Sequence, residues 1–235
     1  MALRAVLVTG FEPYGGGRIN PSLEVVRTLD GTEVASVPVV GRALPVDFRG
    51  LQQRVHAFLT EIDPIAVLNL GLWPGEATIR LERVALNLAD FEIPDNAGEL
   101  VQAMPLDTQA PAAIPSRLPL RAIERALLEA GIPARLSNTA GTFLCNATMY
   151  TFLRQTVGVP CGFVHLPYLP EQVASLLARA KEQRTLEQHQ RADYASMIVP
   201  TMLEALRIIF ATSLAAHQGE DDAGGAAARQ RSPWE

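Results

Sequence analysis

The sequence has few of the features that mark a disulfide-rich, zinc-binding or nucleic-acid-binding protein. Its 235 residues include only two cysteines, Cys145 and Cys161, and four histidines, with no Cys/His pairs at the spacing of zinc ligands. This pattern excludes a disulfide framework and a zinc site, so any cysteine chemistry involves a free thiol. The formal net charge is -5 and no Lys/Arg-rich run occurs. We therefore expect no nucleic-acid partner, because phosphate-backbone binding depends on clustered positive charge.

A long hydrophobic run is also missing near the start of the chain. The apolar run that begins at Ala5 ends after Val8, which is too short for a signal-peptide core or a membrane span. We therefore expect a soluble, cytoplasmic protein that does not bind membranes. Hydrophobic residues nevertheless make up 48% of the chain, which is enough for a substantial core. One large domain is the simplest interpretation of this length.

What the chain does contain is an alternation of strand-like and helix-like segments. Strands are predicted at 5–9, 34–40, 65–70, 134–138 and 161–166 with a strand pair within 78–93, and helices at 22–29, 46–62, 118–130, 144–155 and 192–214. This order predicts an α/β fold with a largely parallel sheet covered by helices. Because the sequence after His217 is polar and glycine-rich, we expect one domain over residues 1–216 and a disordered tail over 217–235.

Cys145 is the first candidate for chemistry. It stands in SNTAGTFLCNATMY, where a turn of small residues joins a predicted strand to a predicted helix. At a helix start, backbone N–H groups and the positive end of the helix dipole stabilise a thiolate and a developing oxyanion, so we expect a depressed thiol pKa. The alternative is a small buried hydrophobic residue, as cysteines commonly are. The motif alone favours that alternative, and a nucleophile needs a partner.

His165 is the candidate partner. It ends a predicted strand in GFVHLPYLPE, at the sheet edge where α/β sites assemble, and its ordinary pKa suits a base that takes a thiol proton. A structural histidine is the alternative. The other histidines, His56, His189 and His217, lie in helical or tail segments without a neighbouring motif. Cys161, at a strand start, is interpreted as a core residue.

The residue pattern does not single out an acid to orient the histidine. Glu82 lies in a strand-like segment between Arg80 and Arg83, which equally describes a solvated surface cluster. The same pattern admits four other acids: Glu61, Glu76, Asp90 and Glu92.

The glycine-rich segment at residues 9–17, TGFEPYGGG, offers a ligand-binding loop. It lacks the G-x-G-x-x-G spacing and the Lys-Ser/Thr ending of nucleotide-binding loops, so nucleotide binding is disfavoured. Phe11 and Tyr14 are better interpreted as aromatic walls for a small flat ligand that the backbone can approach closely. The alternative is a tight turn whose aromatic residues pack on the core.

Four segments together resemble the pyroglutamyl peptidase (pyrrolidone-carboxylate peptidase) family of cysteine peptidases: LVTGFEPYGG with Asn20-Pro21, LERVALN followed by IPDN, SNTAGTFLCN, and GFVHLPYLPEQ. The resemblance extends from Ala5 to about Leu214. It implies a single-domain α/β/α sandwich with a mostly parallel, partly mixed sheet, no metal or organic cofactor, and assembly into a homodimer or homotetramer. The implied activity is removal of N-terminal pyroglutamyl residues from peptides.

The resemblance also assigns roles to the candidates. It makes Cys145 the nucleophile that forms a thioester acyl-enzyme, His165 its base, and Glu82 the acid that orients the histidine. The expected pocket for the pyroglutamyl ring has aromatic contacts from Phe11 and Tyr14, apolar contacts from Ile93, Phe143 and Leu144, and backbone hydrogen bonds near Asn20 and Leu72.

Several residues depart from the family pattern. The family often has phenylalanine at Tyr14, arginine at Glu76 and arginine at Glu92, and the segment from Cys145 to His165 looks shorter than usual. Since the pocket is then more acidic than in the family, two alternatives stay open. One is a thiol amidase for another small N-acyl or lactam group, and the other is a catalytically silent ligand-binding protein of the same fold.

Overall fold

The structure, a computed structural model, describes residues 3–183 and 194–227. Seven strands form the main sheet: β1 (Leu3–Phe11), β2 (Glu33–Val34), β3 (Val37–Leu44), β4 (Ile62–Leu72), β5 (Ile79–Glu82), β8 (Ala134–Ser137) and β9 (Cys161–Leu166). Their order across the sheet is β2-β3-β1-β4-β9-β5-β8. A separate two-stranded sheet pairs β6 (Val84–Leu86) with β7 (Ala113–Pro115).

The main sheet is mostly parallel. Strands β3, β1, β4 and β9 run in one direction, whereas β5 is antiparallel to β9 and parallel to β8, and the short β2 is antiparallel to β3. Because β5 runs antiparallel to β9, its first residues lie beside the carboxyl end of β9, where Arg80 pairs with His165. The predicted mixed, mostly parallel sheet is confirmed.

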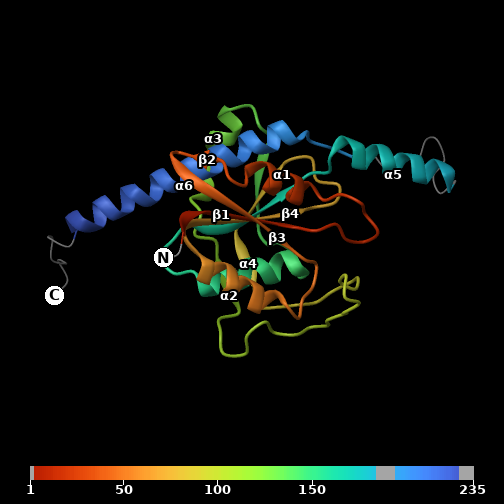
Figure 1. Ribbon diagram of the computed structural model, residues 1–235, viewed down its shortest axis with the longest axis horizontal. Helices are drawn as coiled ribbons and strands as arrows, with labels where there is room; N and C mark the ends of the chain where they lie inside the picture. The colour runs from red at the N-terminus through yellow and green to blue at the C-terminus, as the bar shows by residue number, and fades with distance from the viewer. Residues whose placement is uncertain (1–2, 184–193, 228–235) are drawn as a thin grey trace.

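Helices cover both faces of the sheet (Figure 1). Six helices are described: α1 (Pro21–Leu29), α2 (Leu51–Glu61), α3 (Leu120–Glu129), α4 (Leu144–Gln155), α5 (Pro170–Glu182) and α6 (Val199–Ala227). Helices α1, α3 and α6 pack on one face, where Val6 and Val8 of β1 point, and α2 and α4 pack on the other, where Ala5 and Leu7 point. This alternation buries both faces of the central strands and gives the α/β/α sandwich that the family resemblance implies.

Local signals set some of the helix starts. Asn20 caps α1 by accepting a hydrogen bond from the backbone N–H of Ser22 (3.1 Å), as its place before Pro21 predicts. The predicted helix at 46–62 begins only at Leu51. Its first residues form a turn instead, because the Asp47 carboxylate accepts from the backbone N–H groups of the two residues before Leu51.

The predicted strand pair within 78–93 is wrong in its partners. Strand β5 joins the main sheet between β9 and β8, and β6 pairs with β7, which lies where no strand is predicted. Arg83 separates the two strands, and its backbone bonds to Ser137 and Ser116 (2.9 and 2.8 Å) lead the chain from one sheet to the other. Long-range pairing therefore overrides the local hairpin signal.

The last helix also differs from its predicted bounds of 192–214. It begins at Val199 and continues to Ala227, through residues that the sequence pattern assigned to the tail. Alanine, the strongest helix former, is frequent in this segment. It favours a helix where the polar and glycine-rich composition predicted a tail. Residues 192–193 and 228–235 lie outside the described residues, and the division of the chain at residue 216 stays a prediction.

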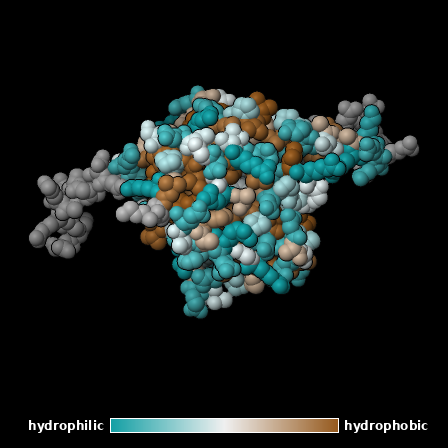
Figure 2. All heavy atoms as spheres, viewed as in Figure 1, coloured by the Kyte–Doolittle hydropathy of each residue, from teal (hydrophilic) through white to brown (hydrophobic). Residues whose placement is uncertain are grey.

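Helix α6 is apolar and long enough, over Val199–Gly219, to span a membrane by length and composition alone. Within this protein it packs against the sheet and against α1 and α3, and it buries Met202, Leu206, Ile209 and Phe210 in the core. These contacts explain its apolar composition as that of a core helix. On the face shown in Figure 2, hydrophobic residues form patches among hydrophilic ones.

Candidate active site

Strand alternation brings three polar side chains to the α4 face of the sheet. Phe163 of β9 packs in the core beneath α4, so His165, two residues later, points to the same side. Leu81 of β5 packs in the opposite core, so its neighbours Arg80 and Glu82 point toward α4. The period of two therefore places these charged groups beside the histidine, under the start of α4.

Cys145 lies in the first turn of α4, as predicted. The next residue, Asn146, anchors this turn: its side chain accepts from the backbone N–H of Leu86 (2.7 Å) and donates to the carbonyls of Leu86 and Leu88 (both 2.9 Å). Phe143 occupies the N-cap position, where its apolar side chain supplies no acceptor for the helix. The first-turn N–H groups therefore remain suited to bind a developing oxyanion.

Gly71 of β4 lets the helix start approach the sheet. A Cβ atom at this position would lie 2.9 Å from both Cys145 Sγ and Phe163 Cζ, closer than side-chain atoms tolerate, so only glycine fits without a shift. Gly71 is also the parallel-strand partner of His165. Cys145 and His165 consequently line one pocket, of about 380 Å³.

Glu82 is the acid that meets the histidine. His165 Nδ1 lies 2.7 Å from Glu82 Oε1, and the two side chains are 1% and 0% exposed. A carboxylate only accepts hydrogen bonds, so Nδ1 carries the proton and Nε2 is left as the base. The structure therefore selects Glu82 from the five acids that the residue pattern admitted.

Arg80 completes this buried network, and sequence reasoning did not identify it. Its Nε donates to Glu82 Oε1 (2.7 Å) and its Nη2 donates to the carbonyl of Thr139 (3.0 Å). Its guanidinium carbon lies 3.7 Å from the ring centre of Trp73, which meets the His165 ring edge-on at 5.0 Å. The i, i+2 spacing of Arg80 and Glu82 on one strand is the signal that places both on one face.

The expected depressed pKa of Cys145 is wrong. Burial, with a smaller contribution from the Glu82 charge, raises the pKa of the Cys145 thiol to about 12. Burial also lowers the pKa of His165, although the hydrogen bond and charge of Glu82 oppose this. Desolvation therefore outweighs the helix start at Cys145, and it favours the uncharged forms of both the thiol and the imidazole.

Four of the seven predicted ring-binding residues line the pocket with Cys145 and His165: Tyr14, Leu72, Ile93 and Phe143. The rings of Tyr14 and Phe143 lie 6.1 Å apart. Burial strongly raises the pKa of Tyr14, so it presents a neutral phenol. The lining is thus largely aromatic and apolar, as a small uncharged ring requires.

The other three predicted ring-binding residues are not among those that line the pocket. Phe11 and Leu144 are 3% and 1% exposed and pack in the core beneath α2 and α4. Asn20 is 1% exposed and is engaged in capping α1 and in donating to the carbonyl of Glu12 (3.1 Å). The family resemblance suggested these contacts, and they stay a prediction.

Sequence reasoning also missed part of the lining. Trp73 and Pro74 follow the carboxyl end of β4, and residues 140–142 form the turn before α4. Their position after strand ends was the available signal. Asp90 and Glu92, considered only as orienting acids or as departures from the family, also line the pocket.

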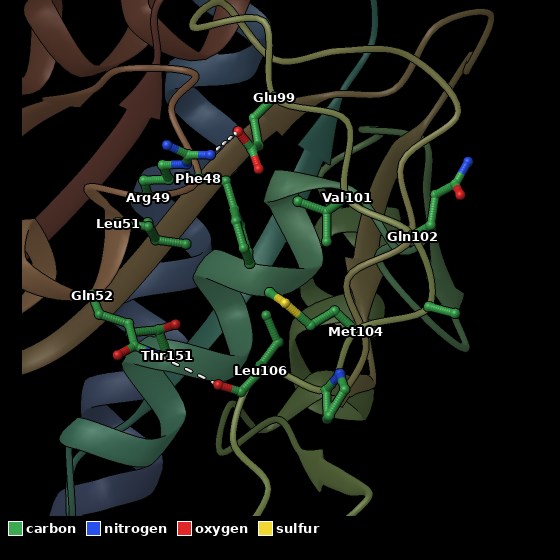
Figure 3. Close-up of a pocket in the computed structure, with 12 residues that line it drawn as sticks. Phe48, Arg49, Leu51, Gln52, Glu99, Val101, Gln102, Met104, Leu106 and Thr151 are labelled. Carbon is green, nitrogen blue, oxygen red and sulfur yellow. Dashed lines mark hydrogen bonds and ion pairs between the residues drawn. The ribbon is translucent and has the colours of Figure 1, made fainter.

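A second, larger pocket of about 660 Å³ lies between α2 and the segment 99–106 (Figure 3). Phe48, Val101 and Met104 form apolar walls, and an ion pair joins Arg49 to Glu99 (2.7 Å). The lining contains neither a cysteine nor a histidine. It therefore lacks the groups that the acyl-transfer chemistry needs. Within residues 3–183 and 194–227, no three His, Cys, Asp or Glu side chains are grouped to hold a metal ion.

Comparison with known proteins agrees with this geometry. The family model described as pyroglutamyl peptidase matches residues 4–214. The chain is 39% identical over 205 residues to the pyrrolidone-carboxylate peptidase of Pyrococcus furiosus, covering 86% of this chain and 99% of that one. It is 44% identical over 174 residues to the Yersinia pestis pyrrolidone-carboxylate peptidase, covering 72% of this chain and 81% of that one.

A solved structure is similar as well. A mutant pyrrolidone carboxyl peptidase from Pyrococcus furiosus superposes with a TM-score of 0.83 at 37% identity, covering 92% of this chain and all of that one. The family match over residues 4–214 includes the strands and the helix that carry Cys145, His165 and Glu82. From the extent of the family match and these relatives, the chain belongs to the pyroglutamyl peptidase family.

Proposed function

We infer that the protein is a cysteine exopeptidase that removes N-terminal pyroglutamyl residues from peptides. The observation that supports this most is a thiol and a carboxylate-bound histidine in one pocket, in a chain of the pyroglutamyl peptidase family. Cys145 is the proposed nucleophile, His165 the base and Glu82 the group that orients the base. No step of this chemistry requires a metal or an organic cofactor.

Acylation begins with the neutral pair. His165 Nε2 takes the proton of Cys145 Sγ as the sulfur attacks the pyroglutamyl carbonyl carbon, and Glu82 stabilises the imidazolium that forms. Backbone N–H groups in the first turn of α4 bind the oxyanion of the tetrahedral intermediate. His165 then returns the proton to the leaving amine, the C–N bond breaks, and a thioester remains on Cys145.

Deacylation reverses the roles of the same groups. His165 takes a proton from water, the resulting hydroxide attacks the thioester, and the returning proton goes to Cys145 Sγ as pyroglutamate leaves. Because burial raises the thiol pKa, Cys145 needs a base to take its proton during acylation. Orientation of His165 is therefore central to both steps.

The pocket accounts for a preference for a lactam. Its aromatic and apolar walls, including Tyr14 and Phe143, suit a flat uncharged ring. A neutral lactam is desolvated in such a lining at lower cost than a charged N-terminal amine, although Asp90 and Glu92 also line the pocket and would attract the charge of the amine. We expect the lactam to be preferred, and comparison of pyroglutamyl with other N-terminal conjugates measures the preference.

Release of a reporter amine tests this function. We expect rapid release from a pyroglutamyl conjugate, slow release from prolyl and glutamyl conjugates, and loss of turnover after thiol alkylation. Turnover of the prolyl conjugate alone would favour the alternative of a different thiol amidase. Absence of turnover on all three would favour a catalytically silent protein of the same fold.

We also propose a soluble, cytoplasmic homodimer or homotetramer without a nucleic-acid or membrane partner. The free thiols of Cys145 and Cys161 suit a reducing compartment, and the net charge of -5 disfavours nucleic acid. The exposed Ile93, Leu100 and Met104 are side chains of the type that subunit interfaces bury. Light scattering after size-exclusion chromatography should give two or four times the mass of 25.4 kDa.

A further inference from the structure

We propose that Arg80 is a positioning residue of the catalytic centre, which holds the Glu82 carboxylate toward His165 and braces the pocket wall through Trp73. This proposal rests on the proposed function, because it concerns the same site. It assigns to Arg80 a role through Glu82 and Trp73, without contact to the substrate.

The first support is the shape of the contact. Arg80 Nε and His165 Nδ1 both lie 2.7 Å from the same oxygen, Glu82 Oε1. The second oxygen, Oε2, is buried and has no hydrogen-bond partner among the described residues. Two donors on one oxygen therefore set the direction of the carboxylate, and removal of Arg80 would leave His165 as the only anchor seen in this structure.

The second support is that Arg80 is itself held in place. Its side chain is 11% exposed, and its Nη2 donates to the carbonyl of Thr139, in the turn that leads to α4. Its guanidinium lies 3.7 Å from the Trp73 ring centre, and the Trp73 ring packs 3.6 Å from where a Cβ atom would stand on Gly141. One side chain thus connects the acid, the pocket wall and the turn before the nucleophile.

The third support is charge. A fully buried carboxylate is costly unless a cation or several donors compensate it, and Arg80 is the cation in contact with Glu82. The charged groups that act on His165 are Glu82 and Glu76, which raise its pKa, and Arg80, which lowers it. Loss of Arg80 should therefore leave His165 facing a less compensated negative charge and raise its pKa.

The nucleophile and the acids of the pocket complete the surroundings of His165. Cys145 from α4 lines the same pocket, with a thiol pKa raised by burial, and so do Asp90 and Glu92. Glu76 is paired with Arg135 as well as lying 3.9 Å from Arg80. Arg135 is half exposed and is therefore a suitable control: it shares Glu76 with Arg80, but no direct contact joins it to Glu82 or Trp73 in the described structure.

The test compares the pH dependence of kcat/KM for Arg80→Met, Arg80→Lys and Arg135→Met on a pyroglutamyl reporter amide. For Arg80→Met we expect kcat to fall about tenfold or more and KM to change little. The acidic limb of the pH profile of kcat/KM should shift to higher pH by roughly half a pH unit or more. Arg80→Lys should have an acidic limb close to that of the wild type because lysine keeps the positive charge. Arg135→Met should keep the wild-type limb.

A uniform loss of activity with an unchanged acid limb in Arg80→Met would overturn the proposal, as would wild-type behaviour. NMR titration of the His165 ring, assigned with His165→Gln, gives a second readout that needs no substrate. An upward pKa shift in Arg80→Met alone supports the proposal, and no shift overturns it. A wild-type protein without pyroglutamyl turnover would refute the proposed function, while this titration would still decide the role of Arg80.

Discussion

Cys145 and Cys161 differ in their surroundings more than in their acidity. Both lie on the α4 face of the sheet, and burial raises both thiol pKa values, to about 12 and about 11. Cys161 is fully buried at the amino end of β9, where Thr156 and Arg117 lower its pKa slightly against the effect of burial. Cys145 lines a pocket that also contains His165, at the opposite end of the same strand.

The comparison shows that access and a base, and not a low thiol pKa, separate the candidate nucleophile from the structural cysteine. Five residues of β9 span the distance between Cys161 and His165, so the strand itself keeps Cys161 away from the base. Cys145 reaches the base from another element, because Gly71 allows α4 to approach the sheet. Four experiments test this difference between the two cysteines.

The largest effect is expected from removing each thiol. Cys145→Ala should lower kcat/KM on a pyroglutamyl amide by about ten-thousand-fold or more, because no other group in the pocket replaces the nucleophile. Cys161→Ala should retain activity within about threefold, since it lies outside the pocket. Steady-state kinetics with circular dichroism as a folding check decides the matter. Unchanged turnover by Cys145→Ala would refute the nucleophile assignment.

The next largest effect is expected from changing the acid that orients His165, the base that lines a pocket with Cys145 but not with Cys161. Glu82→Gln should lower kcat about a hundredfold or more, because the amide no longer stabilises the imidazolium and is able to hold the wrong tautomer. Glu92→Gln is the matched control, since Glu92 lines the pocket without contacting His165, and it should change kcat by less than about threefold. Equal losses in both variants would contradict the orienting role of Glu82.

A smaller effect is expected in alkylation. Iodoacetamide should modify Cys145 about tenfold or more faster than Cys161 at pH 8, because only Cys145 is partly accessible. Since its pKa is raised to about 12, the rate should keep rising with pH above 8 and fall steadily below it. Peptide mass spectrometry measures both rates. A rate for Cys145 that stays constant down to pH 6 would show a thiolate and contradict the neutral pair.

The smallest effect is on stability, and here the order of the two cysteines reverses. Cys161→Ala should lower the free energy of unfolding by about 1 to 2 kcal/mol, because it leaves a cavity in a closed core. Cys145→Ala should cost less than about 1 kcal/mol, because its side chain borders a pocket. Urea denaturation with comparison of midpoints and slopes measures both. A greater loss for Cys145→Ala would indicate that its packing matters more than its chemistry.

Much of the fold and part of the site were predictable from the sequence. The alternation of strands and helices, the cap at Asn20, the helix start at Cys145 and the strand end at His165 are local patterns, and the structure has each of them. The residues alone left the roles of Cys145 and His165 open, and the family resemblance supplied them. Phe11, Asn20 and Leu144 are not among the residues that line the pocket, and their part in substrate binding stays a prediction.

By itself, the sequence determined the hydrophobic period of each segment, which distinguishes strands from helices, because apolar spacing and capping act over a few residues. Only the tertiary structure decided which acid meets His165, because β5 joins the main sheet through pairing with β9, some 80 residues away along the chain. It also brought the Arg80–Glu82 pair of β5 to His165 and reversed the expected pKa of Cys145. Both outcomes depend on burial and long-range contact, and desolvation at the completed site exceeds the local influence of the helix start.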